Sequence, residues 1–143
     1  MSAEIPASHL DILEKEFMAT VSTIRHKDGR ISTNPISFDW DGEYLRFSTL
    51  KQRVKYRNLL ADPQITVCVL SSENTTRYIE IRGRAVLEDD PEGAFQQAFW
   101  KKMTGEDEFR FDPPGAERVI VTVLAEQVST PSLYGGKLEE YSR

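Results

Sequence analysis

A run of basic residues between Arg46 and Arg57 is the part of this sequence whose side chains are best suited to binding chemistry. The run holds five Lys or Arg residues, and the chain has no Asp or Glu between Glu43 and Asp62. The chain as a whole is acidic, with a formal net charge of -5 over 143 residues. Positive charge collected in one place on an acidic protein predicts a local site for an anion.

Two secondary-structure elements would position these cations. Residues 44–49 predict a strand that ends in Ser48 and Thr49, and residues 50–61 predict a helix that stops before an Asp-Pro pair. The two hydroxyl groups would then stand beside the start of the helix, where they can donate hydrogen bonds. A strand end with two hydroxyls, followed by a basic helix start, predicts a binding site for a phosphate group.

Lys51, Arg53, Lys55 and Arg57 all fall in the first two turns of that predicted helix. The helix macrodipole is positive at this end, so each cation should cost a few tenths of a kcal/mol unless an anion lies among them. A phosphate would reverse the sign, because backbone N–H groups, the dipole and the side-chain donors would all face it. The alternative is that these residues form an ordinary solvated face of a surface helix.

The other segments predict a mainly β (α+β) fold. Alternating polar and apolar residues, with Asp-Gly turns at 28–29 and 41–42, indicate short antiparallel strands. The six strands expected are residues 17–26, 30–40, 44–49, 64–70, 77–88 and 118–128, with a bulge or bend at Gly83. Short helices flank them, one near residues 8–16 and one at 50–61. We expect a six-stranded antiparallel split β-barrel, because a closed or half-closed barrel hides its sheet edges.

A third helix is expected between Asp90, which could cap it with Pro91 at its first position, and Gly105. Phe95, Phe99 and Met103 recur every fourth residue and predict one apolar stripe on this helix. The neighbouring Trp100 is expected to pack within the fold rather than to contact a ligand.

Length and composition predict one domain over residues 1–143, with an N-terminal helix region at 1–16 and a C-terminal tail at 129–143. Cys68 is the single cysteine, so no intramolecular disulfide can form, which fits a reducing cytoplasm. We expect a cytoplasmic protein without membrane contact, because no stretch approaches about 20 apolar residues. The two histidines have no partners at metal-binding spacing, and the acidic charge disfavours nucleic acid, so neither a metal nor a nucleic-acid partner is expected.

Four motifs in this order resemble the pyridoxamine-phosphate-oxidase-like split β-barrel flavoproteins, the FMN-binding split barrels. They are D-G-R-x-x-x-x-P from Asp28, F-S-T from Phe47, R-x-K-x-x-N-L-x-x-D-P from Arg53 and R-Y-I-E-I-R-G-R-A from Arg77. The resemblance covers roughly residues 19–93, and it is greater to the branch that uses the deazaflavin coenzyme F420. It implies a homodimer with two cofactor sites at the subunit interface.

The resemblance also implies roles for nine residues. Arg53 and Lys55 match the pair that holds the cofactor phosphate, beside the strand end at Ser48 and Thr49. The strand that edges the flavin-type ring matches residues 34–37. A ninth position, on the fifth strand, reaches the cofactor in this family, often across the dimer. The implied cofactor-binding residues are therefore Asn34, Pro35, Ile36, Ser37, Ser48, Thr49, Arg53, Lys55 and Tyr78.

The sequence departs from true pyridoxamine phosphate oxidases in ways that argue against pyridoxal phosphate synthesis. Val54 and Phe38 stand where those enzymes have Arg and Lys, and their longer C-terminal segment is missing. The resemblance implies an F420-dependent oxidoreductase, a reductase that transfers hydride to a small conjugated substrate. FMN-binding oxidoreductases or oxidases, and non-catalytic F420 or flavin carriers, stay open as alternatives. No catalytic residue is identified: Tyr78, His26 and Tyr134 are candidate proton donors that no spacing singles out.

Overall fold

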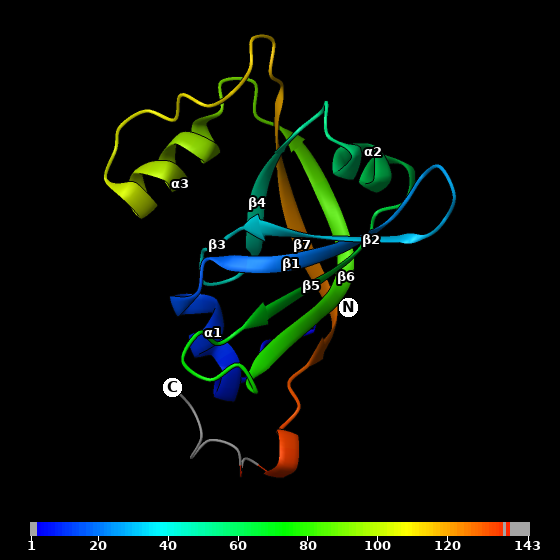
Figure 1. The fold of residues 1–143 in the computed structure, drawn as a ribbon, viewed down its shortest axis with the longest axis vertical. Coiled ribbons are helices and arrows are strands. Elements are labelled where there is room, and N and C mark those ends of the chain that lie inside the picture. Colours follow the sequence, from blue (N-terminus) through cyan, green and yellow to red (C-terminus); the bar gives the residue numbers. More distant parts are fainter. Residues whose placement is uncertain (1–2, 136, 138–143) are drawn as a thin grey trace.

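The computed structural model describes residues 3–135 and residue 137, and its strands form one antiparallel sheet that curls into a half-barrel (Figure 1). The order of strands across the sheet is β2-β1-β5-β6-β7-β4-β3. Their bounds are β1 Met18–Ile24, β2 Ile31–Ser37, β3 Asp39–Trp40, β4 Leu45–Leu50, β5 Gln64–Leu70, β6 Tyr78–Asp89 and β7 Arg118–Ser129. The mainly β, split-barrel architecture predicted from the sequence is confirmed.

The described residues form seven strands rather than six, because the segment predicted as one strand over residues 30–40 is two strands. β2 pairs with β1, whereas β3 pairs with β4 at the opposite edge of the sheet. The break falls at Phe38, whose side chain is 2% exposed and whose N–H donates to the carbonyl of Phe17 at 2.9 Å. A large apolar side chain thus enters the core where the chain crosses from one sheet edge to the other, and this crossing curls the sheet.

The core lies inside the curl, where alternate residues of the strands meet. Val21, Val67, Ile81 and Val121 come from four different strands and are buried in one cluster. The short helix α1, Leu10–Lys15, follows the 3-10 turn η1, Ala7–His9, and buries two side chains in the same cluster. This agrees with the helix predicted near residues 8–16.

A bulge bends the longest strand pair at Gly83. The register of β6 against β7 shifts between Arg82 and Gly83. A Cβ atom on Gly83 would overlap the backbone carbonyl of Leu124 on β7, so only glycine allows this close approach. The bulge or bend expected at this glycine is confirmed.

Helix α2, Val54–Ala61, begins four residues later than the helix predicted over 50–61. The N–H of Arg53 donates to the carbonyl of Leu50 at 3.0 Å, which makes a turn between the end of β4 and the helix. Arg53 is the N-cap residue and has extended backbone angles. The prediction that four cations share the first two turns of one helix was therefore wrong.

Helix α3, Ala94–Thr104, stands apart from the sheet, as Figure 1 shows, and none of its residues is buried. It too begins later than predicted, because Gly93 and not Asp90 is its N-cap residue. The carboxylate of Asp90 nevertheless accepts hydrogen bonds from the N–H groups of Ala94 and Phe95, at 3.1 and 3.0 Å. Among the described residues, no helix is both long enough and apolar enough to cross a membrane.

Candidate functional site

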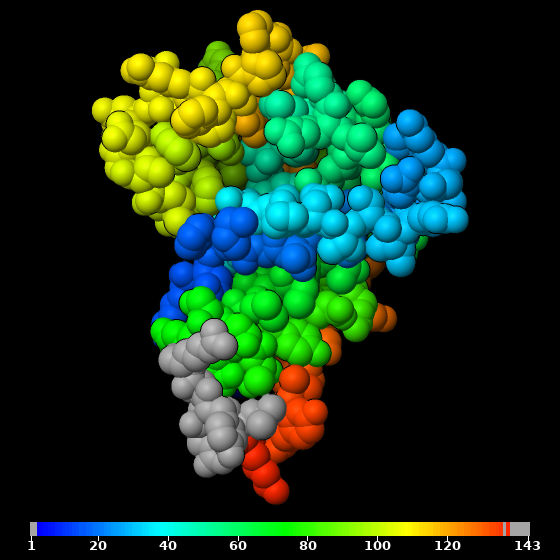
Figure 2. All heavy atoms as spheres, viewed as in Figure 1, coloured from blue at the N-terminus to red at the C-terminus, as the bar shows by residue number. Residues whose placement is uncertain are grey.

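A cavity of about 500 Å³ lies between β2, β4, the start of α2 and the inner side of α3. Figure 2 shows a hollow between the lobe formed by α3 with its following loop and the cyan residues of β2. The volume falls within the usual range for small-molecule sites. The cavity brings together seven of the nine residues predicted to bind a cofactor: Pro35, Ile36, Ser37, Ser48, Thr49, Arg53 and Lys55.

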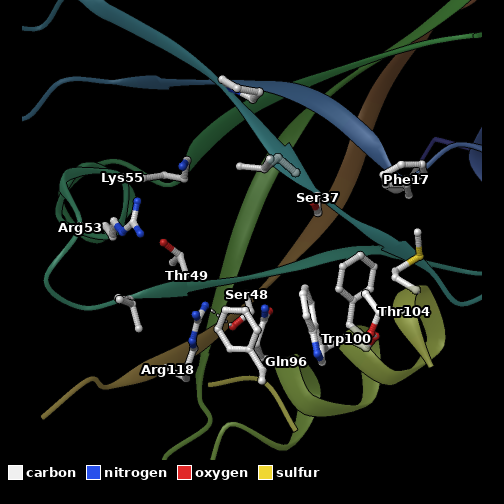
Figure 3. Close-up of a pocket in the computed structure, with 16 residues that line it drawn as sticks. Phe17, Ser37, Ser48, Thr49, Arg53, Lys55, Gln96, Trp100, Thr104 and Arg118 are labelled. Carbon is white, nitrogen blue, oxygen red and sulfur yellow. Dashed lines mark hydrogen bonds between the residues drawn. The ribbon is translucent and has the colours of Figure 1, made fainter. Parts of the chain in front are cut away.

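One end of the cavity is cationic. Arg53 at the N-cap of α2 and Lys55 in its first turn both line the cavity, and Figure 3 shows them on the same side of it, facing Thr49. Within the described part of the chain, neither side chain has a hydrogen-bond or ion-pair partner. Burial, and secondly the nearby charge of Arg53, lower the pKa of Lys55. Two unpaired cations that repel each other, of which Lys55 is partly buried and Arg53 is exposed, would be stabilised by an anion.

The other two cations predicted to lie in the first turns of the helix are used elsewhere. Lys51 lies in the turn before α2, and its Nζ is 3.1 Å from Oδ1 of Asp89. Arg57 donates from Nη2 to the carbonyl of Gln52 at 3.3 Å. The predicted phosphate site thus keeps two of the four cations, Arg53 and Lys55. We call these two residues, together with Ser48 and Thr49, the anion seat.

A third cation of the cavity wall, Arg118, is paired with an acid. Its Nε donates to Oδ2 of Asp112 at 2.9 Å. Its Nη1 donates to Oγ of Ser48 at 3.3 Å, and Figure 3 shows these two side chains together. The Ser48 oxygen therefore accepts from Arg118, which leaves its own proton free to donate toward the cavity. Arg118 had no distinguishing signal in the sequence, because its partners lie in the loop before β7 and at the end of β4.

The upper wall of the cavity in Figure 3 is an edge strand. Among the described strands, β2 is the first in the sheet order and pairs only with β1, so the hydrogen-bonding groups on its other edge have no described strand beside them. Pro35 lacks an N–H group and is tolerated here because the strand is an edge. The free backbone edge from Pro35 to Ser37 can hydrogen-bond a flat, polar-edged ring.

The other end of the cavity is aromatic and apolar. Phe99, Trp100 and Met103 line it from α3, and Phe17 and Phe109 add to it from other parts of the chain. The rings of Trp100 and Phe109 meet edge to face, with their centroids 5.2 Å apart. The apolar stripe predicted on this helix therefore contributes Phe99 and Met103 to the cavity wall. Trp100 was expected only to pack within the fold; it packs against Phe109 and also lines the cavity.

The loop after α3 is fastened to the helix by Gln97. Its side-chain Oε1 accepts from the N–H of Phe109 at 2.7 Å, and its Nε2 donates to the carbonyl of the same residue at 3.3 Å. This clamp holds the Phe109 ring against Trp100. This contact could not be predicted from the sequence, because a loop residue and a helix residue twelve positions apart have no periodic relation.

Two of the predicted cofactor-binding residues lie outside the cavity lining. Asn34 is half-buried on β2 and pairs with Val21, on the opposite strand face from Pro35. Tyr78 is half-buried at the start of β6, where it pairs with Leu70. Of the other candidate proton donors, His26 is hydrogen-bonded to Asn58, and Tyr134 is exposed near the end of the described chain. Much of the predicted tail, residues 136 and 138–143, lies outside the described residues.

The sequence and the fold match known proteins over most of the chain. The family model described as pyridoxamine 5'-phosphate oxidase matches residues 5–130. A solved structure described as an F420 reductase is 34% identical, with a TM-score of 0.75, and the match covers 87% of this chain and 98% of that one. A search of curated proteins found no match.

More distant solved structures share the fold. A putative pyridoxamine 5'-phosphate oxidase from Listeria innocua is 21% identical, with a TM-score of 0.66, over 86% of this chain and 94% of that one. A heme binding protein from Mycobacterium smegmatis is 16% identical, with a TM-score of 0.68, over 93% of this chain and 57% of that one. Identities this low are evidence of a common fold and carry no statement about the ligand.

Proposed function

Because this chain belongs to the pyridoxamine 5'-phosphate oxidase family, we propose that it is an F420-dependent oxidoreductase that reduces a small conjugated substrate. The observation that carries the proposal is the pair of unpaired cations, Arg53 and Lys55, at one end of a cavity whose other end is aromatic. A molecule with a phosphate and a flat ring system matches both ends. The likeness to an F420 reductase at 34% identity favours the deazaflavin over FMN.

The anion seat would hold the cofactor phosphate. Arg53 and Lys55 supply charge-assisted hydrogen bonds, which are stronger than neutral ones. Thr49, 6% exposed at the end of β4, and Ser48 add hydroxyl donors on the same side. No acidic residue of the described chain lines the cavity, so none of the described carboxylates competes within it with the phosphate for these donors.

The ring would lie along the free edge of β2, where backbone groups from Pro35 to Ser37 can meet its polar edge. A reduced deazaflavin, when bound, supplies a hydride. The chain's own part is to fix the ring at its edge, to leave one ring face open, and to keep water away with the side chains of Phe99, Trp100 and Met103. A flat conjugated substrate fits between such a ring and this apolar wall.

We also propose a homodimer in which the outer face of the sheet meets its copy. Ser37 pairs with Met18 and Leu70 pairs with Tyr78, so these four residues lie in rows on the face opposite the core. Met18 and Leu70 are exposed apolar side chains on this face, 45% and 51% accessible. Because Ser37 also lines the cavity, a partner that covers this face brings its own residues toward the site. This would let Tyr78 reach the cofactor of the other subunit.

Sedimentation of the purified protein tests the dimer, and Leu70→Arg is the variant that should dissociate it. We also propose that Asn34, which lies on the ring-edging strand β2, contributes to cofactor binding. One domain over residues 1–143 stays our proposal, supported by the single sheet that all seven described strands join. A cytoplasmic location is a prediction that the single cysteine supports.

Turnover with reduced F420 tests the activity. The protein is mixed with reduced F420 and a panel of flat conjugated acceptors, and reoxidation of the cofactor is followed by its absorbance. Acceptor-dependent reoxidation supports the reductase. Binding of F420 without reoxidation by any acceptor would favour a carrier, and activity with FMN alone would favour the FMN-dependent alternative.

A further inference from the structure

Helix α2, which carries part of the anion seat, is attached to the barrel by very few buried side chains. Asn58 and Leu59 are the buried residues of the helix, 1% and 2% exposed. The apolar side chains of Val54 and Leu60 on the same helix point to solvent, 52% and 64% exposed. A polar side chain is therefore one of the two buried residues of this helix.

The hydrogen-bond partners of the Asn58 amide show which of its two terminal atoms is the oxygen and which is the nitrogen. The backbone N–H of His26 can only donate, and it lies 3.0 Å from Oδ1, so this atom is the oxygen. Nδ1 of His26 is 2.9 Å from the same oxygen and must therefore carry a proton. On the other side, Nδ2 donates to Oγ1 of Thr23 at 3.1 Å, and Thr23 is itself buried. Three hydrogen bonds thus fix the amide in one orientation.

These partners belong to the hairpin between β1 and β2. Thr23 lies near the end of β1, and His26 lies in the turn that leads to β2. The amide thus joins α2, which holds Lys55 one turn before Asn58, to the hairpin that continues into the ring-edging strand. Hydrogen bonds of this side chain therefore connect the two halves of the proposed cofactor site, the cationic end and the edge strand.

We propose that Asn58 is a positioning residue: it holds α2 against the β1–β2 hairpin so that Lys55 and Arg53 face the cavity. The placement of the two cations follows from the structure alone, and the identity of the anion rests on the function proposed above. Loss of the amide would free the helix start to turn outward, because Leu59 is the only other fully buried anchor on α2. Lys55 would then become more exposed to water.

The first test needs no ligand and measures a property of Lys55 itself. The pKa of its amine is measured by NMR in protein labelled at the lysine side chains, with the signal assigned by Lys55→Arg. In the wild type this pKa is lowered, chiefly by burial. In Asn58→Leu, which keeps the side chain branched at Cγ and removes the hydrogen bonds, it should rise toward the ordinary lysine value. An unchanged value would overturn the proposal.

A matched control separates positioning from general loss of stability. Asn74 makes local hydrogen bonds through Oδ1 with the N–H and hydroxyl of Thr76, in a loop whose residues do not line the cavity. Asn74→Leu is the same chemical change, and it should leave the Lys55 pKa where it is in the wild type. If both variants move the Lys55 pKa equally, Asn58 has no special role. Thr23→Val, which removes one hydrogen bond, is the milder variant in case Asn58→Leu does not fold.

The second test is a thermodynamic cycle, with FMN as the probe and fluorescence as the readout of binding. Asn58→Leu should weaken FMN binding about tenfold in the wild-type background and far less in a Lys55→Ala background, because the effect passes through Lys55. An equal loss of FMN affinity in both backgrounds would show that Asn58 acts independently of the lysine, and this result would contradict the proposal. Failure of the wild type to bind FMN or F420 would refute the proposed function, and the Lys55 pKa would still decide the role of Asn58.

Discussion

The guanidinium group of Arg118 lies against the carboxylate of Asp112, with Nε 2.9 Å from Oδ2, and also donates to the hydroxyl of Ser48. The Arg118 side chain is only 12% exposed, and its guanidinium stands over the ring of Phe109 at 5.4 Å. One arginine therefore links the anion seat, the loop after α3 and the aromatic end of the cavity.

Asp112→Ala should leave this nearly buried guanidinium without a carboxylate and lower the free energy of unfolding by about 3 kcal/mol. The matched control is Glu108→Ala in the same loop, which removes the exposed pair with Arg110 and should cost less than about 0.5 kcal/mol. Urea denaturation of the three proteins measures both effects. Equal stabilities for the two variants would mean that Arg118 does not depend on Asp112.

Removal of either seat cation should weaken cofactor binding and leave the fold intact. Arg53→Ala and Lys55→Ala are each expected to lose roughly 1.5–3 kcal/mol of binding free energy, the scale of a hydrogen bond to a charged group. Arg57→Ala is the control, because Arg57 has the same charge on the same helix and does not line the cavity. Isothermal titration with F420 or FMN measures the three affinities. If all three alanine variants lose the same affinity, the helix attracts the anion only through its overall charge.

Anion binding should weaken at a lower pH than it would if the lysine in the site had an ordinary pKa. Burial and the charge of Arg53 lower the pKa of Lys55, so its charge is lost below the usual lysine range. Affinity for the anion is therefore full below this pKa and falls as the pH rises through it. Lys55→Arg keeps its charge and should bind well to higher pH. The difference between the two proteins isolates Lys55 from any titration of the ligand, and identical pH profiles would contradict the assignment.

The same shift predicts that Lys55 destabilises the protein when no anion is bound. A cation whose folded-state pKa is lowered costs stability below that pKa, and this cost disappears as the pH rises toward the unfolded value. Lys55→Met should therefore raise the melting temperature of the ligand-free protein at pH 7. Thermal unfolding with and without FMN measures this, and the wild type should gain more from the ligand than Lys55→Met does. A lower melting temperature for Lys55→Met would show that the lysine is stabilised by contacts within the fold.

Gly83→Ala should be strongly destabilising, because the added methyl group would overlap the carbonyl of Leu124 at the bulge. We expect a loss of about 3 kcal/mol from this overpacking. Gly42→Ala is the comparison: its φ is +96° and there is open space around it, so only backbone strain of about 1–2 kcal/mol applies. Chemical denaturation ranks the two variants, and a smaller loss at Gly83 would mean that the two strands separate easily there.

Most of the barrel was predictable from the sequence because its signals are local. Period-two alternation, the two Asp-Gly turns and, for β5, a near-continuous apolar run predicted β1, β4, β5 and β7 within a residue or two of their bounds. The break at Phe38 was missed because alternation cannot show that a strand changes its partner. The late start of α2 was missed because a turn held by the carbonyl of Leu50 has the same composition as the first turn of a helix.

The candidate site was predictable on its strand and helix-start side and not on its α3 side. Arg53 and Lys55 stood out by charge, and the resemblance to the family added Pro35 and Ser37, which the cavity brings together with them. Phe109 and Arg118 were not identified, because a loop contact and a pairing between distant strands leave no spacing to detect. Tyr78 lies outside the cavity of a single chain, and its role depends on the proposed partner subunit.

The central claim is that Arg53 and Lys55 hold the phosphate of a deazaflavin cofactor. A paired fluorescence titration of the wild type, Arg53→Ala and Lys55→Ala with F420 and with FMN, at moderate salt, tests it most directly. We predict micromolar binding of F420 by the wild type, weaker binding of FMN, and a loss of affinity in both variants. Binding of neither cofactor, or equally tight binding by all three proteins, would contradict the claim.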